Sequence, residues 1–184
     1  MKNLLITALL FLSLAVVALG GGSKSKTHNE VFVPPTPEEE ATATKDFTFG
    51  DIIEFPYKHK GVVPFKHYGV FVGNHRFQTT GEQQGPHDTL FHFSESETGM
   101  KCQFSTVLAA AEGGTYQKKN LHDGKDGWQK NTDEKMVEII TFLANNGCGD
   151  YKLLSNNCEH VSTYVRYSQN VSKQAQRAKK IFAV

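Results

Sequence analysis

The chain has 184 residues, and its 20 Lys and Arg nearly balance its 19 Asp and Glu, which leaves a formal net charge of +1. This balance gives no electrostatic reason to expect nucleic acid as a partner. The length fits one domain with appendages. Thirteen Phe and six Tyr supply enough bulk for a core that does not depend on disulfides.

The first segment, residues 1–20, has the composition of a secretory signal peptide. Lys2 precedes a nearly unbroken apolar run over residues 4–19, which ends in the small residues Ala18 and Gly20. The alternative is an uncleaved N-terminal membrane anchor, although about 16 apolar residues fall short of the roughly 20 that span a bilayer. We therefore expect a secreted protein or, alternatively, an N-terminally anchored one.

Residues 21–45 are polar, and they contain three prolines and the acidic run 38–40. The segment shows no core-forming pattern and predicts a flexible linker. The folded domain is expected to span residues 46–184.

The first half of this domain predicts strands. A short apolar run over 51–55 stops at Pro56, which cannot donate to a sheet ladder. A second run over 67–72 ends at the turn signal Gly73-Asn74, and residues 76–80 are expected to pair with it as a hairpin. Weaker candidates are residues 90–93 and 101–104.

The second half predicts helices. After a glycine-containing, loop-rich stretch over 109–131, Thr132 is a capping residue and Gly147 a terminator for one helix. Residues 151–154 form an extended link, and Asn156-Asn157 precede a helix that begins near Cys158. Residues 171–182 predict a last helix. The class is α+β, an antiparallel sheet with packed helices.

Cys158 is the most informative residue in the chain. At the first turn of a helix, unpaired backbone N–H groups favour negative charge. They lower the pKa of a thiol, which activates it as a nucleophile, and they can stabilise an oxyanion. The alternative is a structural cysteine, which is the more frequent case when no other information is considered.

A nucleophilic thiol needs a base, and His67 is the candidate because it opens a predicted strand and so lies on a rigid element. The alternative is a surface or half-buried histidine without a catalytic role. His160 is a rival base, but two residues along the same helix it points away from Cys158. We expect His160 to pack or hydrogen-bond locally.

Several stretches, in this order, closely resemble the lecithin:retinol acyltransferase family, which includes the Ras-suppressor-like phospholipases. They are Gly50-Asp51-Ile52-Ile53-Glu54, His67-Tyr68-Gly69-Val70-Phe71-Val72-Gly73-Asn74, and Tyr151-Lys152-Leu153-Leu154-Ser155-Asn156-Asn157-Cys158-Glu159-His160, followed by Thr163-Tyr164-Val165-Arg166-Tyr167. The resemblance covers roughly residues 47–180. It implies a circularly permuted papain-like fold of the NlpC type, with the base strand before the nucleophile helix.

The resemblance also implies a reaction. The Cys158 thiolate attacks a glycerophospholipid ester and forms an acyl-thioester, and the acyl group then passes to water, an alcohol or an amine. The enzyme would be a thiol acyltransferase or phospholipase A without a cofactor. A thiol peptidase or amidase is the alternative enzyme, since the wider superfamily cleaves amides.

One departure from the family concerns the third catalytic residue. Family members carry a second histidine twelve residues after the base, and this spacing reaches Thr79. Its hydroxyl is the expected orienting group, with the Gln78 carbonyl as the alternative and His92 as a distant outside candidate. The substitution raises the further alternative of a catalytically weak or inactive secreted binding protein.

The remaining signals are weaker. If Cys158 is the working thiol, Cys102 and Cys148 are left as a candidate disulfide, the alternative being that all three are free. Asn170 begins a glycosylation sequon. The basic last helix predicts either transient contact with anionic membrane lipid or a solvated face. His87, His92 and His122 are scattered through loop-rich sequence without metal-ligand spacing, so no metal is expected.

Overall fold

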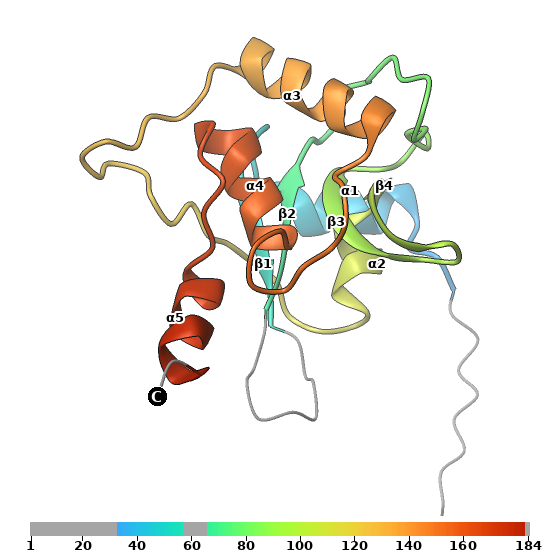
Figure 1. Ribbon diagram of the computed structural model, residues 1–184. Helices are drawn as coiled ribbons and strands as arrows, with labels where there is room; N and C mark the ends of the chain where they lie inside the picture. Colours follow the sequence, from blue (N-terminus) through green and yellow to red (C-terminus); the bar gives the residue numbers. More distant parts are fainter. Residues whose placement is uncertain (1–32, 57–65, 183–184) are drawn as a thin grey trace, which may run out of the picture. The chain divides into compact units, whose positions relative to one another are not determined.

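The computed structural model describes residues 33–56 and 66–182, which form one sheet with helices on both faces (Figure 1). The predicted signal peptide and the first part of the predicted linker lie outside the described residues. The strands are β1 (Ile52–Phe55), β2 (His67–Phe71), β3 (Leu90–Ser96), β4 (Gly99–Ser105) and β5 (Gln117–Lys118). The helices are α1 (Pro37–Thr44), α2 (Val107–Ala111), α3 (Asp133–Asn146), α4 (Cys158–Tyr167) and α5 (Lys173–Phe182).

The sheet has the strand order β4-β3-β2-β1-β5, and all of its pairs are antiparallel. Strand β2 is therefore central, and its alternating side chains divide the core into two parts. Tyr68 and Val70 pack with α3 and α4 on one face, whereas Phe71 packs with Leu90 and Val107 on the other. The expected α+β class is confirmed, and the circular permutation stays a prediction from the resemblance.

Local signals explain the helices that the sequence predicted well. Thr132 caps α3 by accepting a hydrogen bond from the backbone N–H of Lys135, and Gly147 at φ +78° ends the helix. Asn157 caps α4 by accepting from the backbone N–H groups of Glu159 and His160. Strong capping residues stand at these boundaries, so sequence and structure agree to within a residue.

The predicted linker is wrong for Pro37–Thr44, which forms helix α1. Thr36 and Glu39 make a capping box at its start, and Pro37 occupies the first helical turn, where its missing N–H costs nothing. The side chain of Glu40 is buried and accepts hydrogen bonds from the backbone N–H groups of Val107 and Leu108 and from the Thr89 hydroxyl. The helix thus belongs to the folded domain.

The strand predicted over 76–80 is also absent. Side chains take over the backbone hydrogen bonds that a strand partner would make: Gln84 Oε1 accepts from the N–H of Phe77, and Asn145 Oδ1 accepts from those of Thr80 and Gly81. The partner of β2 is β3 instead, with Gly69 opposite His92 and Phe71 opposite Leu90. The hairpin connection is therefore much longer than the one expected.

Candidate active site

Cys158 is the first residue of α4, and its side chain is buried, with 3% of its surface exposed. The thiol donates to the backbone carbonyl of Lys66, with 3.8 Å between Sγ and the oxygen. The backbone N–H of Tyr68 also faces the sulfur. The structure thus brings the start of α4 against the backbone on both sides of His67, although 91 residues separate Cys158 from His67 in the sequence.

His67 begins β2, is half-buried, and packs its ring against Phe55 with 5.5 Å between centroids. Its Nε2 lies 2.8 Å from Nδ1 of His92. The Nε2 of His92 lies 3.1 Å from the Ser94 hydroxyl, which in turn accepts a hydrogen bond from the Gln103 amide. A chain of side-chain hydrogen bonds therefore runs from His67 across β3 to β4.

The structure does not bring Thr79, the expected orienting residue, to His67, and His92, the outside candidate, lies there instead. Thr79 lies in the long β2–β3 connection, and its hydroxyl donates to the carbonyl of Glu82 at 2.6 Å. Gln78 lies in the same connection and is exposed. The second histidine is present but comes 25 residues after His67, because the connection is longer than the family spacing.

The strand register explains how the two histidines meet. Gly69 stands opposite His92, so His67 and His92 are diagonal neighbours on the same face of the sheet. A Cβ added at Gly69 would lie 3.1 Å from Cβ of His92 and 2.8 Å from Leu90 Cδ1. A glycine at this position therefore leaves room for the His92 ring to reach His67.

The protonation states of the pair follow from burial. Desolvation raises the pKa of Cys158 to about 11 and outweighs the backbone N–H groups of Tyr68 and Glu159 and the Tyr151 hydroxyl, which lower it. Desolvation lowers the pKa of His67 to about 4, and burial together with the neighbouring His67 lowers the pKa of His92 well below its ordinary value. The expected activation of the thiol by the helix start is overcome by burial, and the resting pair is a neutral thiol with neutral imidazoles.

Polar groups behind the thiol hold the start of α4. His160 Nδ1 accepts from the backbone N–H of Asn157, which confirms its predicted local role. The Glu159 carboxylate is buried and accepts from the Ser172 hydroxyl at 2.6 Å and from the backbone N–H of Gln174 at 3.1 Å. These contacts join α4 to α5, and no pattern in the sequence signals them, since they depend on how the two helices pack.

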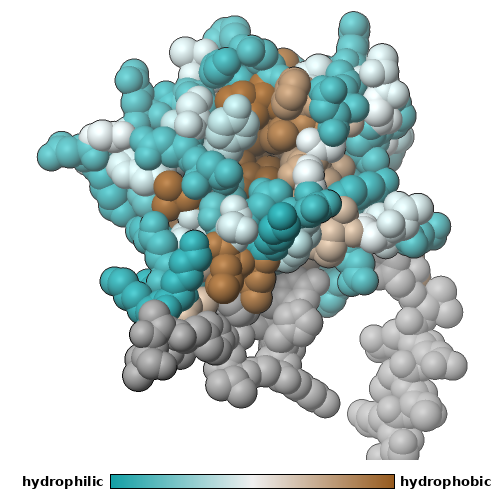
Figure 2. Space-filling model, in the orientation of Figure 1, coloured by the Kyte–Doolittle hydropathy of each residue, from teal (hydrophilic) through white to brown (hydrophobic). Residues whose placement is uncertain are grey.

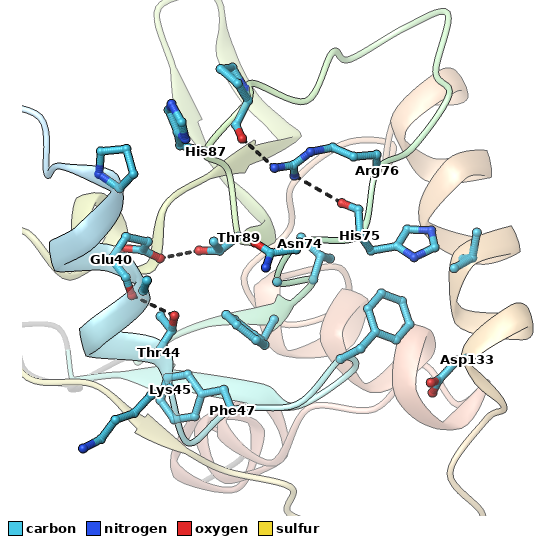
Figure 3. Close-up of a pocket in the computed structure, with 18 of the residues that line it drawn as sticks. Glu40, Thr44, Lys45, Phe47, Asn74, His75, Arg76, His87, Thr89 and Asp133 are labelled. Carbon is cyan, nitrogen blue, oxygen red and sulfur yellow. Dashed lines mark hydrogen bonds between the residues drawn. The ribbon is translucent and has the colours of Figure 1, made fainter.

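A large cavity lies elsewhere. It has a volume of about 830 Å³ and is lined by residues of α1, the end of β2 and the start of α3 (Figure 3). Phe71 and His75 line it, together with exposed Arg76. His67 is four residues from Phe71, a distance of about 13 Å along a strand. This cavity is therefore distinct from the surroundings of Cys158.

Other predicted sites have the following positions. Cys102 and Cys148 form a disulfide with 5.7 Å between their Cα atoms, and Cys158 remains free. Asn170 is exposed in the connection between α4 and α5, and its glycosylation stays a prediction. Within the described residues there is neither a cluster of metal-ligating side chains nor a helix long and apolar enough to cross a membrane.

Comparison with known proteins places this geometry in a family context. The family model described as Lecithin retinol acyltransferase matches residues 45–171. Lecithin retinol acyltransferase of Mus musculus is 26% identical over 142 residues, which cover 71% of this chain and 59% of that protein. The Rattus norvegicus protein of the same name is 25% identical over 190 residues, which cover 95% of this chain and 74% of the relative.

Proposed function

Because the chain belongs to the lecithin retinol acyltransferase family, we propose that it transfers acyl groups from glycerophospholipids through an acyl-thioester on Cys158. One observation carries this proposal. The chain's only free thiol lies at a helix start against the backbone on both sides of His67, and His67 is hydrogen-bonded to His92. The family suggests acyltransferase activity, and the thioester and the substrate are our proposal.

The proposed mechanism uses one of the two proton arrangements that the hydrogen-bond chain allows. In it, His67 Nε2–H donates to Nδ1 of His92, and Nε2–H of His92 donates to the Ser94 hydroxyl oxygen. In this tautomer Nδ1 of His67 carries a lone pair and accepts the thiol proton as Sγ attacks the ester carbonyl. Proton transfer thus accompanies attack, because the resting thiol is neutral.

Three steps follow the attack of the thiol: stabilisation of the oxyanion, departure of the lysophospholipid and transfer of the acyl group. Backbone N–H groups at the start of α4 and the Tyr151 hydroxyl, which faces the sulfur, would stabilise the oxyanion. The ester C–O bond then breaks, and the His67 imidazolium returns its proton to the departing lysophospholipid hydroxyl. Water, an alcohol or an amine next loses a proton to His67 and attacks the thioester. The C–S bond then breaks, and the His67 imidazolium returns that proton to Sγ, which releases the acyl product and restores the neutral thiol.

His92 also bears on the alternatives. The non-catalytic alternative was motivated by a missing second histidine, and that histidine is in hydrogen-bond contact with His67. The matched family, Lecithin retinol acyltransferase, favours acyl transfer over peptide hydrolysis. The acyl-transfer proposal therefore remains the leading one.

Intact-protein mass spectrometry tests the proposal. The chain is incubated with phosphatidylcholine beside its Cys158→Ala and His67→Ala variants. We expect an added acyl mass that hydroxylamine removes, or released fatty acid, and neither in the variants. Full turnover by either folded variant would refute the assignment, and no adduct or released acid from the wild type would refute the phospholipid substrate.

The proposed substrate requires contact with a membrane surface, and α5 has the charge for it. Its exposed residues include Arg177, Lys179 and Lys180, while Ala175 and Ala178 are buried against the domain. Figure 2 shows a hydrophilic surface over this helix, at the lower left. Each basic residue near an anionic surface contributes about 1 kcal/mol of attraction. We therefore assign transient membrane contact to α5.

Vesicle flotation separates this contact from the chemistry. Binding should increase when phosphatidylserine is added to phosphatidylcholine vesicles, and the double variant Arg177→Glu with Lys180→Glu should lose most of that increase. Lys130→Glu, with a side chain that is 42% exposed near α3, is the matched control. Equal binding of both variants would contradict the assignment of membrane contact to α5.

The Cys102–Cys148 disulfide supports the accompanying proposal that the protein matures in the secretory pathway.

A further inference from the structure

The start of α5 makes a specific contact with the base strand. The side-chain amide of Gln174 makes two hydrogen bonds with the backbone of Lys66. The N–H of Lys66 donates to Gln174 Oε1 at 3.0 Å, and Gln174 Nε2 donates to the carbonyl of Lys66 at 3.2 Å. A side-chain amide here pairs with the backbone as a neighbouring strand would.

This pairing occurs where the sheet provides no partner. The β1–β2 ladder ends with Phe55 opposite His67. The residue that follows β1 is Pro56, which has no N–H to donate. The backbone groups of Lys66 therefore need partners from outside the ladder. Gln174 supplies both a donor and an acceptor.

The same backbone group contacts the thiol. The Lys66 carbonyl that accepts from Gln174 also accepts from Sγ of Cys158, and Lys66 directly precedes His67. The backbone N–H of Gln174 meanwhile donates to the carboxylate of Glu159, the residue after Cys158. One residue of α5 thus contacts the neighbours in sequence of both the thiol and the imidazole.

Burial indicates that α5 does not need this amide for docking. Ala175 and Ala178 form the buried face of the helix, with 1% and 0% of their surfaces exposed, whereas Gln174 is half-buried. The Gln174 amide therefore orients the backbone of Lys66 and adds little buried surface to the docking of α5. The two hydrogen bonds hold the N–H and the C=O of Lys66, and this C=O belongs to the peptide group that joins Lys66 to His67.

We propose that Gln174 is a positioning residue that fixes the peptide group before His67 and so aligns the imidazole with the Cys158 thiol. The inference rests on the proposed function, in which His67 takes the thiol proton. Displacements of about 1 Å at a reacting pair can lower turnover by about 10²-fold. Gln174 thereby acts on the chemical step without touching substrate.

A shape-conserving substitution tests the role. Gln174→Met keeps the length of the side chain but removes both hydrogen bonds, and Gln176→Met makes the same change at an exposed position of the same helix. We expect Gln174→Met to lower kcat by about 10- to 100-fold with KM within about threefold. Gln176→Met should retain wild-type values, and thermal unfolding should show both variants folded.

Alkylation of Cys158 gives a readout that does not need turnover. Without Gln174 the Lys66 carbonyl is a less fixed acceptor for the thiol, so its hydrogen bond to the protonated form weakens. Tyr68, Glu159 and Tyr151, which act on the pKa of the sulfur, are unchanged, and His67, with a pKa of about 4, stays neutral over the pH range of the assay. We expect the pH at half-maximal alkylation by iodoacetamide to fall in Gln174→Met and to stay unchanged in Gln176→Met.

The two measurements separate the possible failures. Wild-type kcat in folded Gln174→Met, or an unchanged alkylation profile, would overturn the positioning role. If the wild type acts on no phospholipid, the proposed function fails, but the alkylation comparison still decides whether Gln174 sets the surroundings of the thiol.

Discussion

The contact between His67 and His92 is a single hydrogen bond of 2.8 Å, and it leads to a direct comparison of two residues. His92→Leu removes the hydrogen-bond partner of His67 Nε2, so the imidazole loses the contact that sets its orientation and its tautomer. We expect kcat to fall by about 10²- to 10⁴-fold, the range found when the orienting group of a triad is lost. Initial rates with phosphatidylcholine vesicles measure the effect.

Thr79→Ala is the matched control, because the Thr79 hydroxyl donates only locally, to Glu82. Its rate should stay within about twofold of wild type, as is usual for a surface change of this kind. A large loss in Thr79→Ala together with an active His92→Leu would reverse the assignment of the orienting residue.

The sequence could single out Cys158 and His67 as candidates because both lie inside short, recognisable motifs. His92 could be named only as an outside candidate, since its contact with His67 depends on the length of the β2–β3 connection and on which strands pair. No local residue pattern around Thr79 reveals that the hairpin is extended. Tyr151 faces the sulfur for a similar reason, through a tertiary contact rather than a motif.

The raised pKa of Cys158 predicts how its reactivity depends on pH. Because the pKa is about 11, the thiolate fraction increases about tenfold with each unit by which the pH rises, as long as the pH stays below 11. Iodoacetamide labelling of the native protein should therefore keep accelerating from pH 7 to pH 10. The denatured, disulfide-intact chain provides the control, with an ordinary cysteine profile. A plateau near pH 6 in the native protein would instead indicate a thiolate–imidazolium pair.

At the scale of elements, α1 is held by one carboxylate. Glu40 accepts hydrogen bonds from the backbone N–H groups of Val107 and Leu108. Its loss would leave the Leu108 N–H without its partner and the Val107 N–H with only the longer contact to the Thr89 hydroxyl, 3.4 Å. We expect Glu40→Ala to lower the free energy of unfolding by about 2–4 kcal/mol. Chemical denaturation measures the change.

Glu40→Gln retains one acceptor oxygen and should lose less than half as much stability. Glu38→Ala, at an exposed position of the same helix, controls for the change in helical sequence. If Glu40→Ala were as stable as Glu38→Ala, α1 would not depend on the contact with α2.

These elements also show what the sequence could and could not predict. Helix α3 was predicted to within a residue because Thr132 and Gly147 mark its ends. Helix α1 was missed because three prolines and an acidic run resemble a linker, although the capping box of Thr36 and Glu39 was a usable signal. Residues 76–80 have strand-like composition, but the amides of Gln84 and Asn145 satisfy their backbone instead.

For the whole molecule, the buried histidines predict acid sensitivity. The ordinary pKa of 6.5 falls to about 4 for His67 and well below 6.5 for His92. Between pH 6.5 and 4 the unfolded chain therefore binds protons that the folded chain does not, so the free energy of unfolding decreases as the pH falls. Above pH 6.5 both states are neutral at these histidines and no stability is lost. As the pH falls below 6.5, each histidine lowers the free energy of unfolding by up to about 1.4 kcal/mol per pH unit.

Denaturant midpoints at pH 7.5, 6.0, 5.0 and 4.5 measure this decline. His92→Gln removes one of the two groups and should flatten the curve in that range. Asp51 and Glu54, with lowered pKa values, act in the same direction at lower pH. Stability that stays constant from pH 7.5 to 5.0 would contradict neutral histidines in the folded state.

The neutral state of Cys158 has a further consequence for how the three cysteines are sorted during folding. Thiol–disulfide exchange requires a thiolate, and a pKa of about 11 leaves on the order of one molecule in 10⁴ ionised at pH 7. Once α4 has docked on β2, Cys158 is thus buried and almost entirely protonated, so it exchanges only slowly with the disulfide of Cys102 and Cys148. The fold can carry a permanent crosslink and a reactive sulfur in one chain without scrambling them.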